Sequence, residues 1–394
     1  MSIVHSPSII RDGLLFYYDA SNTKKSWKGQ PATNLTPNPY SNHNGSAFVF
    51  TDYSVTTGGA TYTLRTGVAN PIDSPSVMEY YTGTTDYKYW SIKTTVPSPG
   101  TYTFSYYARL VGGADGNFGN SQIWRNDGVG DATPTGDWNP IMTRSWRRFS
   151  AYGTVNTSLN FFCVHSGAVT GGYTIQYCGF QLESGSYATP FVVGTRSNTQ
   201  SIVDLAGGNT VTANSLTYAS TNSFSFNGTA NYITASTKFP TITNEWTVET
   251  WVKPAASQPT NNNDIWGNHG AYDGFCLQNI GTGTQYAAFY GNGTAWQGWP
   301  SLTFNLTVSV WQCITVTRTT TNTLVIYLNG VQVNSMSVTG NMATGAVDFM
   351  IGQGYSGATR TWSGEIATTS VYGRGLTSNE VVQNFNALRG RFGA

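Results

Sequence analysis

Short runs of alternating apolar and polar residues recur along the whole chain. In the clearest run, 101–109, Tyr102, Phe104, Tyr106 and Ala108 occupy every second position. Successive side chains of a strand point to opposite faces, so this run predicts a strand with one buried face. Further runs that predict strands are 14–19, 48–50, 61–65, 87–93, 146–155, 160–164, 173–183, 223–227, 231–233, 246–253, 311–318, 323–329, 331–335, 349–352 and 365–372. Their close spacing is typical of a β-sandwich.

The sharpest turn signal is Asn329-Gly330, which separates the alternating runs 324–328 and 331–333. Both residues tolerate the positive φ angles that a type I′ turn requires. The sequence therefore predicts a β-hairpin with its turn at these two residues.

A clear helix signal stands at the C-terminal end of the chain. Thr377 and Glu380 have the spacing of a capping box. Apolar residues then recur at helical spacing, at Val381, Val382, Phe385 and Leu388. Because Arg389 would stand at the negative end of the helix dipole, the pattern predicts a short helix that ends just before Gly390.

Composition narrows the classes of protein that the chain can be. Charged residues make up 10% of the 394 residues, against about 25% in an average globular protein, and the net charge is +1. This weak and balanced charge argues against nucleic-acid binding. Aromatic residues make up 14% of the chain and glycine supplies 44 residues, which suits strands and turns. The length exceeds one ordinary core, so we expect an all-β protein of two antiparallel β-sandwich domains.

The sequence predicts neither export nor membrane insertion. Residues 1–11 lack a positive region followed by an apolar core, and no stretch of about 18 apolar residues occurs elsewhere. Four cysteines stand singly in apolar runs, without C-x-x-C spacing or a nearby histidine pair: Cys163, Cys178, Cys276 and Cys313. We expect them to be buried free thiols of a reducing compartment, and we expect neither a metal site nor a cofactor.

Several motifs in the second half resemble one known family. FNGTANYI at 226–233, EWTVETWVKP at 245–254, WQCITVTR at 311–318 and LVIYLNGVQV at 324–333 resemble the laminin G-like, concanavalin A-like jelly roll. The segment 363–393, SGEIATTSVYGRGLTSNEVVQNFNALRGRFG, is similar to the ending of such domains in structural proteins of tailed bacteriophages. The resemblance implies a two-sheet antiparallel sandwich used for binding and for display on particle surfaces.

The same resemblance implies that this domain is discontinuous. Segment 9–27 resembles the opening of the phage members and 203–209 resembles its continuation, yet about 175 residues separate them. The intervening motifs resemble carbohydrate-binding-module jelly rolls, at 34–41, 100–109, 145–155 and 179–196. We therefore expect an opening strand segment in 1–30, an inserted β-sandwich in 31–195 and the main laminin G-like sandwich with a short C-terminal helix in 196–394.

Candidate catalytic motifs are incomplete. Hydrolases of the concanavalin A-like fold carry E-x-D-x-E on one strand, but here Thr247 replaces the central acid between Glu245 and Glu249. The four histidines are far apart and none accompanies a G-x-S-x-G elbow. No helix signal follows the G-x-G-x-x-G match at 352–357, which indicates a loop between strands and not a dinucleotide site. We expect no enzyme activity.

A stretch rich in aromatic and amide residues is the best candidate for a binding site. Sugars stack their C–H faces on aromatic rings and present hydroxyls to amide or carboxylate groups. The candidate glycan-binding residues are Trp266, His269, Tyr272, Asp273, Trp296 and Trp299. These rings could instead fill a core or a protein interface. The insert holds a similar set of aromatic and acidic residues: Trp124, Asp127, Asp137 and Trp138. No cluster of Asp and Asn residues in the sequence is dense enough to assign a calcium site.

The resemblance implies a structural protein of a bacteriophage virion, assembled in the host cytoplasm and displayed in the tail, baseplate, fibre or capsid decoration. Its expected partners are other virion proteins, further copies of itself and a host surface glycan, with no nucleic acid and no membrane insertion. The alternatives are a separate glycan-binding lectin and a polysaccharide-degrading enzyme of the same fold.

Overall fold

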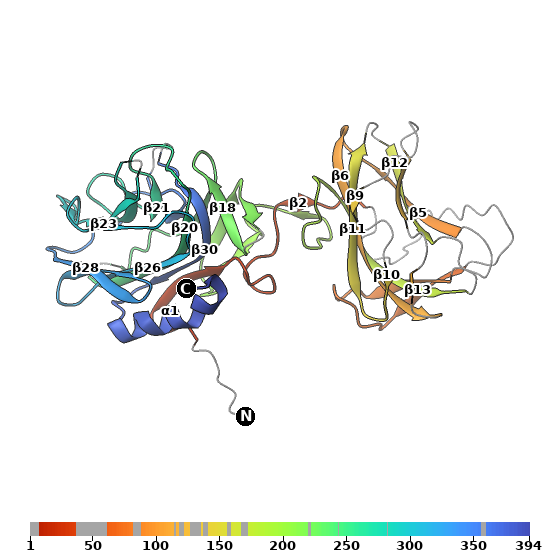
Figure 1. Ribbon diagram of the computed structural model, residues 1–394, viewed down its shortest axis with the longest axis horizontal. Helices are drawn as coiled ribbons and strands as arrows, with labels where there is room; N and C mark the ends of the chain where they lie inside the picture. The colour runs from red at the N-terminus through yellow and green to blue at the C-terminus, as the bar shows by residue number, and fades with distance from the viewer. Residues whose placement is uncertain are drawn as a thin grey trace, which may run out of the picture. The chain divides into compact units, whose positions relative to one another are not determined.

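The computed structural model describes residues 8–394 except 37–60, 82–87, 114–115, 118–121, 127–134, 137–140, 156–158, 167–171, 220–221, 243, 282 and 356–359. The chain forms two compact units (Figure 1). Unit 1 consists of Met1–Gln30 and Ser197–Ala394, and unit 2 consists of Pro31–Arg196. Almost every regular element is an antiparallel strand, so the predicted all-β class is confirmed.

The first sheet of unit 1 has the strand order β17-β18-β30-β20-β26-β27-β28. Its strands are β17 (Thr217–Ala219), β18 (Ser223–Asn227), β30 (Ser363–Tyr372), β20 (Trp246–Pro254), β26 (Gln312–Arg318), β27 (Thr323–Leu328) and β28 (Val331–Ser337). Strand β1 (Leu14–Asp19) pairs with the C-terminal half of β30, at Thr368–Tyr372. On the same edge of β30, β18 pairs with the N-terminal half. The predicted pairing of 14–19 with the C-terminal block is thus observed.

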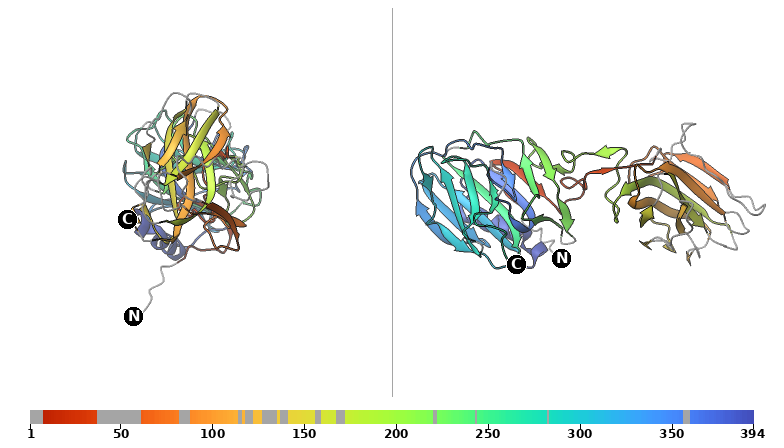
Figure 2. Two further views of the ribbon diagram at one scale, coloured as in Figure 1. Left: turned by 90° about the vertical axis from the view of Figure 1, so that its right-hand side faces the viewer. Right: turned by 90° about the horizontal axis from the view of Figure 1, so that it is seen from above.

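The second sheet of unit 1 has the order β15-β16-β19-β29-β21-β22-β23-β24, and β25 also pairs with β23. Its strands are β15 (Ile202–Val203), β16 (Thr210–Asn214), β19 (Tyr232–Ala235), β29 (Met350–Ile351), β21 (Asp264–Gly267), β22 (Phe275–Asn279), β23 (Gln285–Gly291), β24 (Trp296–Gln297) and β25 (Thr303–Asn305). The right-hand view of Figure 2 shows the strands of this unit from above.

The core of unit 1 lies between the two sheets and is built largely from aromatic rings. Trp246 of β20 stacks on Phe275 of β22 with ring centroids 5.1 Å apart, and Phe16 of β1 meets Phe349 at 6.0 Å. All four rings are fully buried. Because β1 supplies Phe16 to this core, the opening segment is an integral part of the sandwich.

The predicted hairpin is confirmed. Asn329 and Gly330 have φ angles of 52° and 79°, and Leu328 pairs with Val331 across the turn. Positive φ at both central residues is the signature of a type I′ turn, whose twist matches that of the flanking strands.

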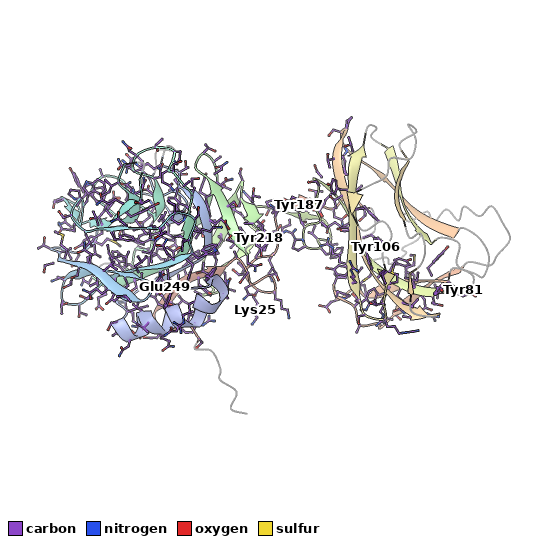
Figure 3. All side chains as sticks on the ribbon, in the orientation of Figure 1. Lys25, Tyr81, Tyr106, Tyr187, Tyr218 and Glu249 are labelled. Atoms are coloured by element: carbon purple, nitrogen blue, oxygen red, sulfur yellow. The ribbon has the colours of Figure 1, made fainter. Side chains whose placement is uncertain are left out.

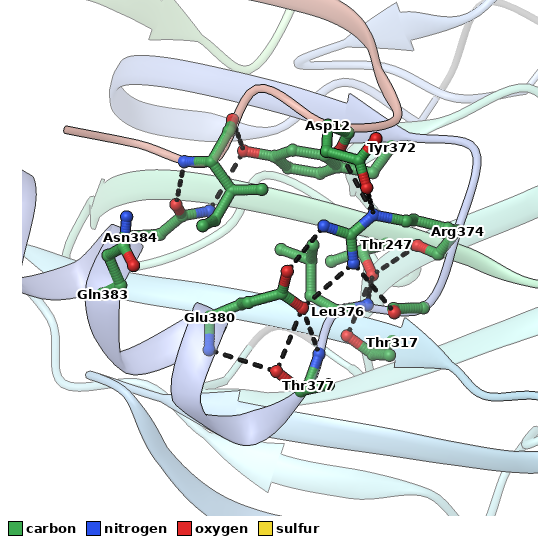
Figure 4. Close-up of polar contacts among 12 residues, drawn as sticks. Asp12, Thr247, Thr317, Tyr372, Arg374, Leu376, Thr377, Glu380, Gln383 and Asn384 are labelled. Carbon is green, nitrogen blue, oxygen red and sulfur yellow. Dashed lines mark hydrogen bonds and ion pairs between the residues drawn. The ribbon is translucent and has the colours of Figure 1, made fainter.

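The C-terminal helix, α1 (Ser378–Phe392), begins with the predicted capping box at Thr377 and Glu380. Glu380 also pairs with Arg374 at 2.6 Å, and Arg374 lies 2.9 Å from Asp12 (Figure 4). The predicted end before Gly390 is wrong. The helix continues to Phe392 because the Phe392 ring stacks on Trp251 at 4.3 Å, and Gly393 caps it in the left-handed conformation.

Unit 2 contains a six-stranded sheet in the order β3-β4-β13-β6-β11-β9 and a three-stranded sheet in the order β5-β12-β8. The first comprises β3 (Thr61–Thr66), β4 (Ser76–Tyr81), β13 (Thr174–Ser184), β6 (Gly100–Gly112), β11 (Arg147–Val155) and β9 (Thr135–Gly136). The second comprises β5 (Lys88–Thr95), β12 (Leu159–Ser166) and β8 (Gln122–Asn126), and a further pair is β7 (Gly116–Asn117) with β10 (Ile141–Met142).

The central strand of unit 2, β6, differs from its prediction in one respect. Phe104 and Tyr106 are buried as expected, but Thr103 and Ser105 on the other face are buried too. Thr103 donates a hydrogen bond to the carbonyl of Gly185 at 2.8 Å, in the segment that follows β13. A covering segment therefore buries the face that alternation assigned to solvent.

The two ends of unit 2 lie side by side. Strand β2 (Ala32–Thr33) pairs with β14 (Thr195–Arg196), with Thr33 opposite Thr195 and Ala32 opposite Arg196. Asn34 extends this closure by donating hydrogen bonds to the carbonyls of Phe180 and Val192, both at 2.9 Å. The chain therefore enters and leaves unit 2 at neighbouring positions.

Cys178, Cys276 and Cys313 are free and buried, as predicted, and the Cys163 side chain lies outside the described residues. Among the described helical residues, no helix combines the length and apolar character that a membrane span requires.

Candidate functional site

A cavity of about 320 Å³ opens on the outer face of the second sheet of unit 1. It gathers residues from β22, β23, β24 and the loops beside them. Its lining consists of Asn262, His269, Gly270, Ala271, Tyr272, Gln278, Phe289, Trp296, Trp299, Tyr355 and Arg360. Four of the six predicted glycan-binding residues belong to this lining: His269, Tyr272, Trp296 and Trp299.

Strand alternation explains which side chains face the cavity. On β22, Phe275 and Leu277 point into the sandwich core, so Cys276 and Gln278 point outward. On β23, Phe289 lies opposite Cys276 and shares its outward direction. The outer face of this sheet thus carries a small apolar cluster apart from the main core.

Trp266, one of the predicted glycan-binding residues, does not line the cavity. A bulge between Asp264 and Trp266 inserts Ile265 as an extra residue, so Asp264 and Trp266 point to opposite faces although they are two positions apart. Trp266 is fully buried in the core, with its ring 5.7 Å from that of Phe275. A ligand in the cavity cannot reach it.

Asp273 supports the cavity wall and does not line it. Its Oδ1 accepts hydrogen bonds from the backbone N–H groups of Gly270 at 2.6 Å and Ala346 at 3.1 Å. Gly291 permits this loop to lie close, since a Cβ there would meet the backbone of Tyr272 at 1.9 Å. The carboxylate therefore fixes the shape of the loop that carries His269 and Tyr272.

The rim of the cavity is aromatic. The Phe289 ring lies 5.0 Å from Trp296 and 5.2 Å from Trp299, and both tryptophans are partly exposed. Tyr272 is 46% exposed, with its ring 5.5 Å from that of Trp296. On another part of the lining, the Arg360 guanidinium covers the Tyr355 ring at 4.4 Å. A ligand would therefore meet several ring faces and one cation.

Below this rim lies a buried polar group centred on Asp264. Gln278 Nε2 donates to Asp264 Oδ1 at 2.6 Å, the Cys276 thiol donates to the same oxygen at 3.2 Å, and His269 Nε2 lies 3.3 Å from Oδ2. Burial raises the pKa of the Cys276 thiol well above its usual range, and the Asp264 carboxylate raises this pKa further. Sequence reasoning missed Asp264, Cys276 and Gln278, because only the strand register and the bulge bring them together.

The carboxylates of the incomplete E-x-D-x-E match are outside this cavity. Glu249 is buried beneath α1 (Figure 3), where the hydroxyl of Thr315 donates to it at 2.9 Å. Thr247 is also buried, and its hydroxyl oxygen accepts from the backbone N–H of Leu376 at 2.9 Å. The strand therefore presents no pair of accessible carboxylates.

Other predicted candidates lie partly or wholly outside the described residues. The G-x-G-x-x-G match contributes Tyr355 to the cavity lining, and 356–359 are not described. The second aromatic and acidic set, in unit 2, has side chains outside the described residues: Trp124, Asp127, Asp137 and Trp138.

Unit 1 is a β-sandwich of two antiparallel sheets, and the cavity opens on the outer face of the second sheet. Residues 227–382, which include the whole cavity lining, match the model of the concanavalin A-like lectin/glucanases superfamily, Laminin_G_3. The predicted resemblance of this segment to the laminin G-like, concanavalin A-like jelly roll is confirmed. No curated protein matches the chain.

Similar solved structures include the receptor-binding domain of botulinum neurotoxin type G, with 17% identity and a TM-score of 0.39 over 47% of this chain and 48% of that chain. The binding domain of botulinum neurotoxin DC in complex with rat synaptotagmin II has 12% identity and a TM-score of 0.38, over 49% and 50% of the two chains. This chain thus spans about half the length of those chains.

Proposed function

We propose that unit 1 binds a glycan of a host cell surface in the aromatic cavity. The observation that carries this proposal is the partly exposed rim of Tyr272, Trp296 and Trp299 above the polar side chains of His269 and Gln278. Aromatic faces take up the C–H faces of a sugar, and the polar groups beneath them hydrogen-bond its hydroxyls. The rim and the floor thus offer both kinds of contact within one cavity.

The size of the cavity favours a short part of a glycan. Ligand cavities in proteins measure about 300–1,000 Å³, and this cavity, at about 320 Å³, stands at the small end of that range. The family matched by residues 227–382 contains lectins and glucanases, which is consistent with a carbohydrate ligand. We therefore expect recognition of a terminal sugar or a short branch.

The proposal is for binding without hydrolysis. Glycosidases place two carboxyl groups on either side of the scissile bond, about 5–10 Å apart. Glu249 is covered by α1, Asp264 is buried below the rim, and no carboxylate belongs to the lining among the residues that the structure describes. We expect the chain length of a bound polysaccharide to remain unchanged.

We further propose that the protein is displayed on a bacteriophage virion as an oligomer that contacts other virion proteins. The support is the resemblance of 363–393 and 9–27 to phage structural proteins and the insertion of one sandwich into another. Mass spectrometry of purified virions, with antibody labelling in electron micrographs, should find the protein on the particle. Its absence from purified particles, together with a monodisperse monomer in solution, would contradict this part.

Replacing Trp296 or Trp299 by Ala should weaken glycan binding by at least about tenfold, or about 1.4 kcal/mol, because each substitution removes a stacking face. The melting temperature should fall little, since both rings pack on Phe289 in the outer cluster and not in the main core. Binding is measured by calorimetry with purified host polysaccharide, whose chain length is checked afterwards.

Trp311→Ala is the matched control. Trp311 is a partly buried tryptophan of unit 1 that packs on Phe392 at 4.9 Å, outside the cavity lining. This variant should keep the affinity of the parent. If Trp296→Ala and Trp299→Ala fold and bind as the parent does, the glycan site is not in this cavity.

A further inference from the structure

Three side chains with metal-ligating atoms meet at the floor of the cavity. A carboxylate oxygen of Asp264, a ring nitrogen of His269 and the Sγ of Cys276 all lie within 4.8 Å of one another, and all three residues are buried. Asp264 and Cys276 stand on the paired strands β21 and β22, and His269 follows β21 by two residues. Strand pairing therefore holds two of these groups in place.

The distances suit a tetrahedral ion. Two nitrogen or oxygen ligands at about 2.0–2.1 Å from a tetrahedral ion are about 3.3 Å apart. His269 Nε2 and Asp264 Oδ2 are 3.3 Å apart, and Cys276 Sγ lies 3.2 Å from the other oxygen of the same carboxylate. Small rotations of these side chains would direct all three ligand atoms to one point.

The Asp264 carboxylate is buried with few charged neighbours. It is 0% exposed, and its one ion-pair partner among the described residues is His269. The Arg360 guanidinium acts on the same group from the cavity side, where it counteracts the rise that burial causes in the pKa of Cys276, and it covers the Tyr355 ring instead of pairing with Asp264. His269 is 1% exposed, and its Nδ1 is buried without a hydrogen-bond partner in the described part of the chain. Buried charges and buried polar atoms are costly unless they are paired. A cation bound by Nε2 would compensate the Asp264 carboxylate, and Nδ1 would then carry the proton of the neutral imidazole.

The backbone packs closely around the three groups. A Cβ at Gly354 would lie 3.0 Å from the Cβ of Asp264, and a Cβ at Gly267 would lie 3.3 Å from Cys276 Sγ. The backbone N–H of His269 donates to the carbonyl of Gly354 at 3.0 Å, which fixes the start of its loop. The ligand atoms are thus held by a rigid frame, as an ion-binding site requires.

We propose that Asp264, His269 and Cys276 bind a divalent transition-metal ion of the zinc class. Calcium and magnesium take oxygen ligands, whereas a mixed nitrogen, sulfur and oxygen set suits zinc. Gln278 lies on the cavity side of Asp264. If its side-chain amide is turned so that Oε1 faces the site, this oxygen can be the fourth ligand in place of a water molecule. Binding would displace the thiol proton of Cys276. The proposal goes beyond glycan binding and does not depend on it.

The test uses the metal-free full-length protein, titrated with Co²⁺ and then with Zn²⁺ alone. We expect one equivalent of Co²⁺ to produce a thiolate-to-cobalt charge-transfer band, which Zn²⁺ then abolishes by displacement. Zn²⁺ should raise the melting temperature of unit 1, and Mg²⁺ and Ca²⁺ should not. Cys276→Ser should lose the band and bind Zn²⁺ at least about tenfold more weakly.

Cys313→Ser provides the matched control, because Cys313 is an equally buried free thiol of unit 1 on another face of the sandwich. It should keep the band and the zinc affinity. A parent protein that shows no band, or a folded Cys276→Ser variant that keeps it, overturns the proposal. If Cys276→Ser does not fold, His269→Gln decides: a zinc affinity about tenfold weaker supports the site, and an unchanged affinity overturns it.

Discussion

Deletion of residues 1–30 should leave unit 1 unfolded. The deletion removes Phe16 and Tyr18, which are fully buried in the sandwich core, and Trp27, which stacks on Tyr218 at 5.5 Å. Each large side chain withdrawn from a core costs about 1.5–3 kcal/mol. Three such losses, together with the backbone pairing of β1, approach the whole stability of a domain, which is about 5–15 kcal/mol. Chemical denaturation followed by tryptophan fluorescence measures the effect.

The matched control is a deletion of a larger segment that should leave unit 1 folded. Residues 33–195 are replaced by a short Gly-Ser linker, which has only to join two positions that already pair, Ala32 and Arg196. The shortened protein should unfold cooperatively with the midpoint of unit 1 in the full chain. If a fragment that starts at residue 196 melts at the same midpoint as the shortened protein, β1 is not needed for the folding of unit 1.

Glu249→Gln should stabilise unit 1 above neutral pH by up to about 3 kcal/mol. Burial raises the pKa of Glu249 to about 7, from an ordinary value of 4.5. The folded state therefore binds the proton more tightly than the unfolded state does. The stability that this group contributes is complete below pH 4.5 and is lost as the pH rises through 7, by about 1.4 kcal/mol per unit of pKa shift. Glutamine keeps an oxygen that accepts from Thr315 and carries no charge.

The measurement is the free energy of unfolding at a series of pH values between about 4.5 and 8. The parent should lose stability across this range relative to Glu249→Gln, whose curve should lack this component. Glu245→Gln is the control, because Glu245 directly precedes β20, the strand that carries Glu249, and is only partly buried. Parallel curves for the parent and Glu249→Gln would contradict the buried, proton-binding state of this carboxyl.

Features encoded by neighbouring residues could be predicted from the sequence. The type I′ turn at Asn329 and Gly330 needs two residues that tolerate positive φ, and the capping box needs a hydroxyl and a carboxylate three residues apart. The end of α1 could not be predicted in this way, because Phe392 extends the helix through a contact with Trp251, distant in sequence.

The candidate site was predictable in its rim and not in its floor. Tyr272, Trp296 and Trp299 stand out as aromatic residues among polar loop residues. Trp266 stands in the same stretch, but a bulge turns it into the core. Asp264 and Cys276 are 12 positions apart, and nothing in their own neighbourhoods shows that they touch. Strand register, which depends on the whole sheet, decides these contacts.

The pairing of β1 with β30 has a consequence for synthesis on the ribosome. Asp19 pairs with Thr368, so about 350 residues must be translated between the two partners. At roughly 5–20 residues per second this takes roughly 20–70 s. During that interval unit 2, whose sequence is continuous, can complete its own pairing, while the apolar side chains of β1 remain without their partner strand. Unit 1 is begun before unit 2 and finished after it, so Phe16 and Tyr18 stay exposed to chaperones and to neighbouring nascent chains until β30 has been made.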